Sequence, residues 1–226
     1  MTIFQHARLL FAALMAIASL RAAPAATPLF PATGATAICP DTPLRLTFAA
    51  APVLGSTGKI QIVDASNRTV VESIDVSSPT AVKDIGGLPG YKYYPVVIAG
   101  HEATIYPRNG ALAYGKTYYV TIEAGVFQLG ADAVGALDQP AAWRFTTKAV
   151  PPTKGAAKHI VAADGTGDFC TVQGALDFIP DGNTTPTTLL LRRGTYPEMV
   201  FFTNKHAIPL LGEDRKQSII AYATND

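Results

Sequence analysis

Carboxylates are the side chains of this sequence most able to do chemistry. Asp164 and Asp168 flank a short glycine-rich turn, and two acids on one loop can hold calcium or a substrate. Glu213 and Asp214 form a second acidic pair, followed directly by two basic residues. A glycine-rich turn with acids is more often simply a turn, and a mixed-charge loop is more often a solvated surface. We therefore predict no catalytic pair and no metal site at either place.

Nucleophilic catalysis has no complete set of residues in the chain. His101, His159 and His206 stand alone near expected strand ends or loops, and no G-x-S-x-G segment occurs. A Ser-His-acid mechanism is therefore unsupported. The glycine-rich turn also lacks the Lys-Ser/Thr ending of a phosphate-binding loop, and we predict no cofactor.

The two cysteines, Cys39 and Cys170, lie in different halves of the chain. They have no C-x-x-C spacing and no histidine nearby, which argues against a zinc site or a redox motif. Two interpretations stay open: a disulfide that joins the two halves, or two buried free thiols.

Composition indicates which elements position these side chains. The 226 residues are 48% hydrophobic and 15% charged, with 18 Lys and Arg against 17 Asp and Glu. Nucleic acid is excluded as an expected partner, because binding its backbone requires clustered cations. Abundant Thr, Val, Ala and Gly favour short strands over a helical bundle. We predict a mainly β protein of one or two domains.

The N-terminus has the pattern of an export signal. Arg8 precedes an uncharged apolar run over residues 9–20, and Ala23-Pro24-Ala25 fits a signal-peptidase site. The run is shorter than the roughly 20 residues that span a bilayer. We predict a signal peptide over residues 1–25, a secreted or periplasmic protein, and no membrane segment after its removal. A retained anchor is the alternative, disfavoured because Arg21 interrupts the run.

A proline-rich stretch over residues 149–157 has the composition of an exposed linker. Before it, residues 27–148 show period-two alternation typical of strands with one buried face. We expect strands at residues 44–48, 59–64, 69–76, 94–98, 103–106, 117–124 and 143–146. About seven short strands in this length suit an antiparallel sandwich.

Three segments of this first region carry a resemblance. ICPDTPLRLTF, AYGKTYYVTIEAGVF and WRFTT resemble the bacterial Ig-like module of the S-layer type that often precedes secreted enzymes. The resemblance implies an Ig-like sandwich that acts as a spacer or attachment domain and supplies no chemistry.

The second region, residues 158–226, begins with a short strand and then a helix. Val172, Ala175, Leu176 and Ile179 fall at i, i+3, i+4 and i+7, and Pro180 stops the pattern. Short apolar runs follow at residues 188–191, 199–202, 208–211 and 219–222. A helix-capped parallel β-helix fits this order, although periodicity alone leaves a second small sandwich open.

Ordered segments of the second region resemble the beginning of a pectinesterase, the enzyme that removes methyl esters from pectin. They are VAADGTGDFCTVQGALDFIP, LLLRRGTYPEMV and PLLGEDRKQSIIAY. Gly194, Tyr196 and Glu198 match the G-x-Y-x-E motif of that family. The resemblance implies the helix-capped start of a right-handed parallel β-helix, with pectin or a related polysaccharide as partner. Tyr196 and Glu198 would share one strand face, lining a sugar groove or stabilising neighbouring turns.

The later pectinesterase motifs, which carry the acid/base aspartate, the nucleophilic aspartate and an arginine, do not occur before Asp226. We therefore assign no catalytic residue, and expect a truncated esterase that is inactive by itself. The alternative is a non-catalytic surface or polysaccharide-binding protein, in which Tyr91, Tyr93 and Tyr94 would stack on sugar rings. The sequence predicts no oligomeric state.

Overall fold

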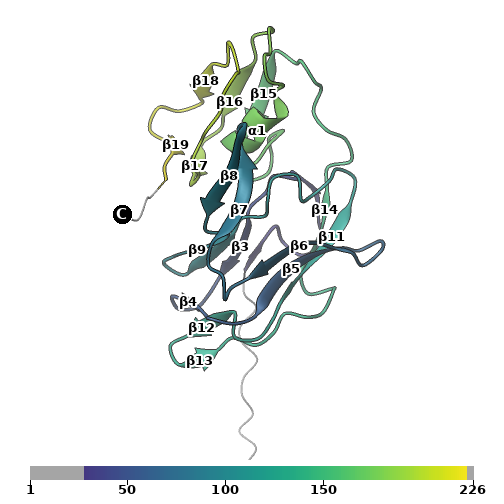
Figure 1. The fold of residues 1–226 in the computed structure, drawn as a ribbon, viewed down its shortest axis with the longest axis vertical. Helices are drawn as coiled ribbons and strands as arrows, with labels where there is room; N and C mark the ends of the chain where they lie inside the picture. Colours follow the sequence, from purple (N-terminus) through teal and green to yellow (C-terminus); the bar gives the residue numbers. More distant parts are fainter. Residues whose placement is uncertain (1–27, 223–226) are drawn as a thin grey trace, which may run out of the picture.

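A computed structural model of the chain describes residues 28–222. Two regions are stacked along its long axis: a β-sandwich and, above it, a smaller region that holds α1 (Figure 1). The expected signal peptide, residues 1–25, lies outside the described residues. Among those described, no helix has the length and apolarity needed to cross a membrane. The protein is mainly β, as predicted.

The sandwich consists of two sheets. The first has the order β1-β3-β10-β9, with strands Leu29–Phe30, Leu44–Thr47, Glu102–Ile105 and Val96–Ala99. The second has the order β2-β14-β11-β5-β6, with strands Ala35–Ile38, Arg144–Thr147, Thr117–Ile122, Lys59–Asp64 and Val70–Asp75. Neighbours are antiparallel except for β2 and β14, which pair in parallel. The prediction of an antiparallel sandwich is therefore wrong for the pair β2 and β14.

Alternating side chains build the sandwich core. In β11, Tyr118, Val120 and Ile122 are buried, whereas the residues between them are partly exposed. The two sheets close on one cluster to which both contribute. Trp143 is fully buried there, and its indole N–H donates to the Pro31 carbonyl at 2.9 Å. Because a buried indole needs an acceptor, this bond fixes the ring.

Two smaller sheets extend from the sandwich. β4 (Val53–Leu54), β12 (Phe127–Leu129) and β13 (Asp132–Ala133) form one of them, at the end far from α1 in Figure 1. β7 (Ala81–Ile85) and β8 (Leu88–Tyr93) form a hairpin that rises beside α1. Its two turn residues, Gly86 and Gly87, have φ of +52° and +87°, which only glycine adopts readily.

The second region contains parallel strands and one helix. β15 (Lys158–Val161), β16 (Thr188–Leu191) and β18 (Leu210–Gly212) form one parallel sheet, and β17 (Gly194–Tyr196) and β19 (Ser218–Ile220) form another. Helix α1 (Val172–Phe178) buries the predicted stripe of Val172, Ala175 and Leu176 against this region's own core.

One expected strand does not form. Residues 199–202 are irregular, although their apolar run predicts a strand. The backbone N–H of Phe201 donates to Oε1 of Gln173 at 2.9 Å, and its carbonyl accepts from Nε2 of the same side chain at 2.9 Å. A helix side chain thus takes the hydrogen bonds that a neighbouring strand would need.

Candidate functional site at the junction of the two regions

The start of α1 lies where the sandwich meets the second region. Thr171 is the N-cap residue, and its Oγ1 accepts from the backbone N–H of Gly174 at 2.9 Å. Asp41 reaches this point from the sandwich. Its carboxylate accepts from the N–H groups of Cys170 and Thr171 at 3.0 and 2.8 Å, and from the Thr171 hydroxyl at 2.7 Å. The first region therefore satisfies backbone donors of the second.

Glu198 completes the helix start from the other side. Its two carboxylate oxygens accept from the N–H groups of Val172 at 2.7 Å and Gln173 at 2.9 Å. These donors have no partner within the helix, so an acidic side chain stabilises them. Burial nevertheless raises the pKa of Glu198 to about 7, and the nearby Asp41 charge adds to this effect. Burial also raises the pKa of Asp41.

Tyr196 is anchored inside the second region. Its side chain is only 1% exposed. The phenol hydroxyl lies 2.9 Å from the carbonyl oxygen of Val161 and 3.0 Å from that of Arg192. Tyr196 and Glu198 are thus both held by other parts of the protein. Contact of either residue with a sugar stays a prediction.

Gly194 begins β17, which ends at Tyr196. Glu198 lies beyond the strand, so the prediction that Tyr196 and Glu198 share one strand face is wrong. A Cβ atom added at Gly194 would meet the Cβ atom of Ala163 at 3.3 Å, which leaves little room for a larger residue. All three motif residues therefore have tight packing or hydrogen bonds that fix residues 194–198.

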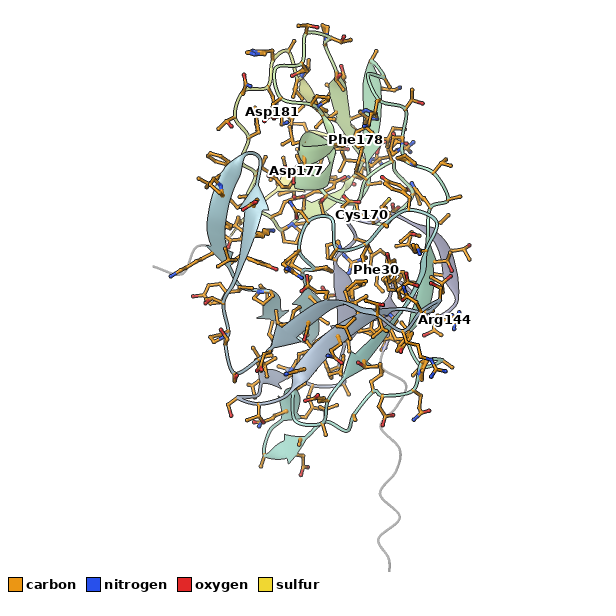
Figure 2. All side chains as sticks on the ribbon, turned by 45° about the vertical axis from the view of Figure 1, so that its right-hand side comes forward. Phe30, Arg144, Cys170, Asp177, Phe178 and Asp181 are labelled. Atoms are coloured by element: carbon orange, nitrogen blue, oxygen red, sulfur yellow. The ribbon has the colours of Figure 1, made fainter. Side chains whose placement is uncertain are left out.

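The hairpin β7–β8 makes a second contact across the junction. The N–H of Gly86 donates to Oδ1 of Asp177 at 3.0 Å, and the Gly86 carbonyl accepts from the N–H of Thr203 at 3.1 Å. Asn109 of the sandwich donates to the other oxygen of Asp177. Figure 2 shows Asp177 on the helix and Cys170 below it, at the boundary of the two regions. Burial raises the pKa of Asp177.

The two cysteines meet at the same boundary. Cys39 and Cys170 are free and buried, and their sulfur atoms and a carboxylate oxygen of Asp41 all lie within 4.8 Å of one another. The Cys39 thiol points at the Gly167 carbonyl at 3.5 Å, and the Lys148 ammonium donates to the same oxygen. The sequence positions of Cys39 and Cys170 do not predict that their thiols lie close together.

The other residues singled out from the sequence have local contacts. Oδ1 of Asp164 accepts from the N–H and hydroxyl of Thr166, at 3.0 and 2.7 Å, which is the pattern of a polar turn. Asp168 accepts from the N–H of Ile160 at 2.8 Å. His159 is buried between Phe169 and Phe178, and burial lowers its pKa. The acidic pair at residues 213–214 lies apart, beside Arg192 and Arg193.

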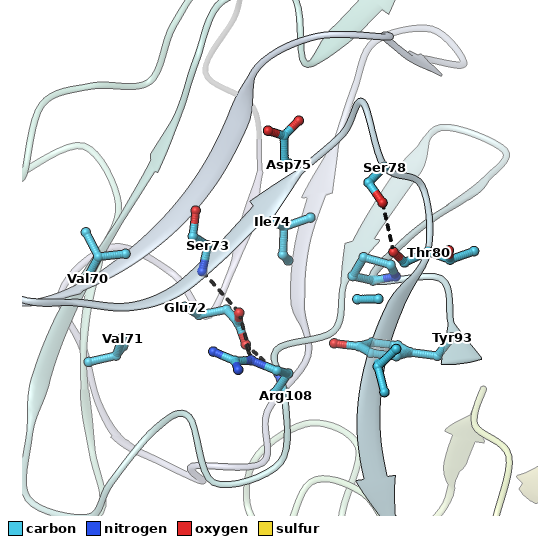
Figure 3. Close-up of a pocket in the computed structure, with 13 residues that line it drawn as sticks. Val70, Val71, Glu72, Ser73, Ile74, Asp75, Ser78, Thr80, Tyr93 and Arg108 are labelled. Carbon is cyan, nitrogen blue, oxygen red and sulfur yellow. Dashed lines mark hydrogen bonds and ion pairs between the residues drawn. The ribbon is translucent and has the colours of Figure 1, made fainter. Parts of the chain in front are cut away.

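A groove of about 460 Å³ lies beside the edge strand β6 (Figure 3). Tyr93 and Arg108 border it, and the buried Glu72 accepts from the backbone N–H of Arg108 at 2.8 Å and from its Nε at 3.0 Å. These charged groups are already paired with each other. The groove lies between β6 and the hairpin β7–β8, away from the Gly194–Glu198 segment.

Three tyrosines lie in β8 or directly after it. Tyr94 is 52% exposed. Tyr91 is partly buried, and its hydroxyl interacts with that of Tyr222 from the second region. Burial, and then this interaction with Tyr222, raise the pKa of Tyr91 to about 12. Sequence reasoning proposed Tyr91, Tyr93 and Tyr94 as one platform, but Tyr93 is buried and lines the groove instead.

Comparisons with known proteins divide the chain at the same place. Residues 21–147, more than half of the chain, match the family model of the bacterial Ig-like domain. Residues 158–226 match that of pectinesterase.

Curated relatives fall in the second region. Residues of this chain are 34% identical over 70 positions to a probable pectinesterase/pectinesterase inhibitor 23 of Arabidopsis thaliana, covering 30% of this chain and 12% of that protein. They are 39% identical over 67 positions to pectinesterase 1 of Citrus sinensis, covering 29% and 12%. The chain therefore spans about an eighth of the length of these relatives.

One solved structure, that of CopC from Methylosinus trichosporium OB3b, covers 54% of this chain and 93% of its own. Its identity of 16% and TM-score of 0.29 are too low to bear on fold or function.

Proposed function

Because this chain belongs to the bacterial Ig-like domain family through residues 21–147 and matches pectinesterases over residues 158–226, we propose that it is an exported part of a pectin-demethylating system. In this proposal residues 1–25 are the export signal, residues 27–148 form the Ig-like module, and residues 149–157 link it to the esterase-like region. The substrate class is pectin, whose methyl esters a pectinesterase hydrolyses.

We further propose that residues 158–226 are the first turns of a right-handed parallel β-helix. Two parallel ladders support this architecture. Ile160, Leu190 and Leu211 are register neighbours across β15, β16 and β18, and Thr195 is paired with Ile219 across β17 and β19. Helix α1 packs on β15 and β16, where it covers their apolar side chains.

The motif Gly194-x-Tyr196-x-Glu198 carries the proposal. The Tyr196 hydroxyl lies against the carbonyl oxygens of Val161, at the end of β15, and Arg192, just after β16. Glu198 binds the first amides of α1. The family motif thus joins the strands to the helix that covers them. This gives the motif a physical purpose in the scaffold that does not depend on contact with substrate.

Ester hydrolysis needs one carboxylate to attack the carbonyl and a second to transfer a proton. The three carboxylates at the junction, those of Asp41, Asp177 and Glu198, accept hydrogen bonds from backbone N–H groups. A carboxylate held in this way is a poor nucleophile, because attack would cost those bonds. We therefore propose that these 226 residues supply scaffold and do not hydrolyse the ester by themselves.

Methanol release from highly methylated pectin tests this proposal. The purified chain is expected to release no methanol above a blank, while an active pectinesterase in the same assay does. Methanol release by the purified chain above the blank would refute the proposal, and release that disappears in a Glu198→Gln variant would also refute the scaffold role of that residue. The variant Glu102→Gln, which changes a partly exposed carboxylate of the sandwich, is the matched control.

A second function, polysaccharide binding, is favoured by the exposed tyrosines. Tyr94 presents an open ring, and Tyr91 and Tyr222 bring rings from both regions together, which suits stacking on sugars. Affinity electrophoresis in a gel containing pectin measures this directly. Binding predicts that the wild-type chain is retarded and that Tyr94→Ala migrates faster, whereas Val97→Ala, which removes another exposed apolar side chain, behaves as wild type. Equal migration with and without pectin would exclude this function.

A further inference from the structure

The two cysteines are the feature that neither the motif nor the sandwich uses. Cys39 directly follows β2, and Cys170 directly precedes the N-cap Thr171. Cys39 and Cys170 are 0% and 2% exposed, and their sulfur atoms lie within 4.8 Å of each other inside the junction. Asp41, two residues after Cys39, binds the N–H of Cys170 at 3.0 Å. The two backbone segments are therefore already held together next to the thiols.

A metal ion fits this cluster poorly. Of the described residues, Cys39, Asp41 and Cys170 are the group that could hold one. The carboxylate of Asp41 already accepts from two backbone N–H groups and a hydroxyl, and coordination would break those bonds. Structural zinc sites have four ligands, and this cluster offers three. Two thiols on adjoining backbones are instead suited to bonding with each other.

We propose that Cys39 and Cys170 form a disulfide that covalently locks the Ig-like module onto the second region. The oxidant is a disulfide of a small thiol or of an oxidase. One cysteine thiolate attacks a sulfur of that disulfide, which forms a mixed disulfide and expels one thiolate that takes up a proton. The other cysteine loses its proton, attacks the protein-bound sulfur of the mixed disulfide and expels the second thiol. The two protein thiols are oxidised by two electrons, and the oxidant is reduced to two thiols.

The surroundings of the thiols assign their order of reaction. A hydrogen bond from Cys170 and the charge of Lys148 lower the pKa of Cys39. The same bond to Cys39, followed by burial and the charge of Asp41, raises the pKa of Cys170. Cys39 is therefore the first nucleophile and Cys170 the resolving thiol. Because both are buried, exchange takes place before the two regions dock or during a local opening. The bond encloses most of the sandwich in one loop, and long loops give the largest constraint on the unfolded chain.

Thiol trapping on the whole chain tests the bond. The reduced chain is incubated with a mixture of reduced and oxidised glutathione, quenched with acid, unfolded and alkylated, and its mass and cysteine peptides are measured. We expect both thiols to be lost to alkylation together, with one peptide linking residues 39 and 170. The midpoint of thermal unfolding should rise by about 5–10 °C over that of the reduced chain. The Cys39→Ser and Cys170→Ser variants should keep one reactive thiol each.

Three results would overturn the proposal. One is alkylation of both thiols after equilibration at an oxidising glutathione ratio. Another is a product limited to glutathione adducts or to linked dimers of the chain. The third is binding of one equivalent of zinc by the reduced chain with an affinity that prevents oxidation. Should a serine variant fail to fold, the comparison of oxidised with reduced wild type still decides the question. The test needs neither pectin nor export, so its failure is distinct from a failure of the proposed function.

Discussion

Replacing Glu198 with glutamine tests whether this residue is a buried helix-capping group. The carboxylate caps α1 through Val172 and Gln173, yet burial raises its pKa from 4.5 to about 7. A raised pKa in the folded state means that folding favours the protonated form. The stability linked to this group is complete below the unfolded-state pKa and is lost as the pH rises through about 7.

The size of the effect follows from that shift. A pKa difference of one unit corresponds to about 1.4 kcal/mol. Between pH 5 and pH 8 the wild-type protein should therefore lose about 2.5 kcal/mol of unfolding free energy through Glu198. Glutamine does not titrate, so the variant should lack this part of the pH dependence. Contributions of Asp41 and Asp177 are present in both proteins and largely cancel when the two are compared.

Urea unfolding followed by circular dichroism at pH 5 and pH 8 measures the difference. We expect the stability gap between wild type and Glu198→Gln to shift by about 2.5 kcal/mol over this interval, in favour of the variant at the higher pH. Glu102→Gln, which changes a carboxylate with a 42% exposed side chain, should follow the wild-type profile. Identical pH profiles for wild type and Glu198→Gln would refute the assignment of Glu198 as a desolvated capping group.

Two further substitutions probe the junction and the motif. In Gly86→Ala the new Cβ would meet the Phe201 carbonyl oxygen at 1.8 Å, whereas in the control Gly90→Ala, at a similarly positive φ, it would meet nothing within 4 Å. Amide hydrogen exchange should therefore accelerate at residues 201–203 in Gly86→Ala but not in Gly90→Ala. Equal exchange rates in the two variants would contradict the docking of the hairpin. Tyr196→Phe removes the hydroxyl that donates to the carbonyls of Val161 and Arg192, but the Val161 carbonyl still accepts from the N–H of Arg192. The variant should therefore lose about 0.5–1.5 kcal/mol in urea unfolding, while an unchanged midpoint would show that the hydroxyl is dispensable.

Local patterns predicted the elements well where one face is buried. The expected strand at residues 59–64 coincides with β5, and the apolar spacing from Val172 to Ile179 locates α1. Alternation and helical periodicity are properties of neighbouring residues, so they can be read directly from the chain.

Contacts across the junction could not be predicted in this way. Asp41 and Thr171 are 130 positions apart, and nothing near Asp41 marks it as a partner for a helix. The strands of the β7–β8 hairpin, at residues 81–85 and 88–93, lack a clear alternation in sequence and are absent from the predicted strands. The strand predicted at residues 199–202 is wrong for the opposite reason. The apolar run indicates a strand, but the side chain of Gln173 forms hydrogen bonds with the backbone N–H and carbonyl of Phe201.

The shared capping of α1 limits how this architecture can be recombined. Glu198 supplies one half of the polar partners at the helix start, and Asp41, from a different module, supplies the other. Grafting an unrelated Ig-like module in front of residue 158 would leave the amides of Cys170 and Thr171 facing a surface with no acceptor. A chimera would fold as well as the parent only if its donor module carried an acid where Asp41 stands, so the two modules are expected to change together.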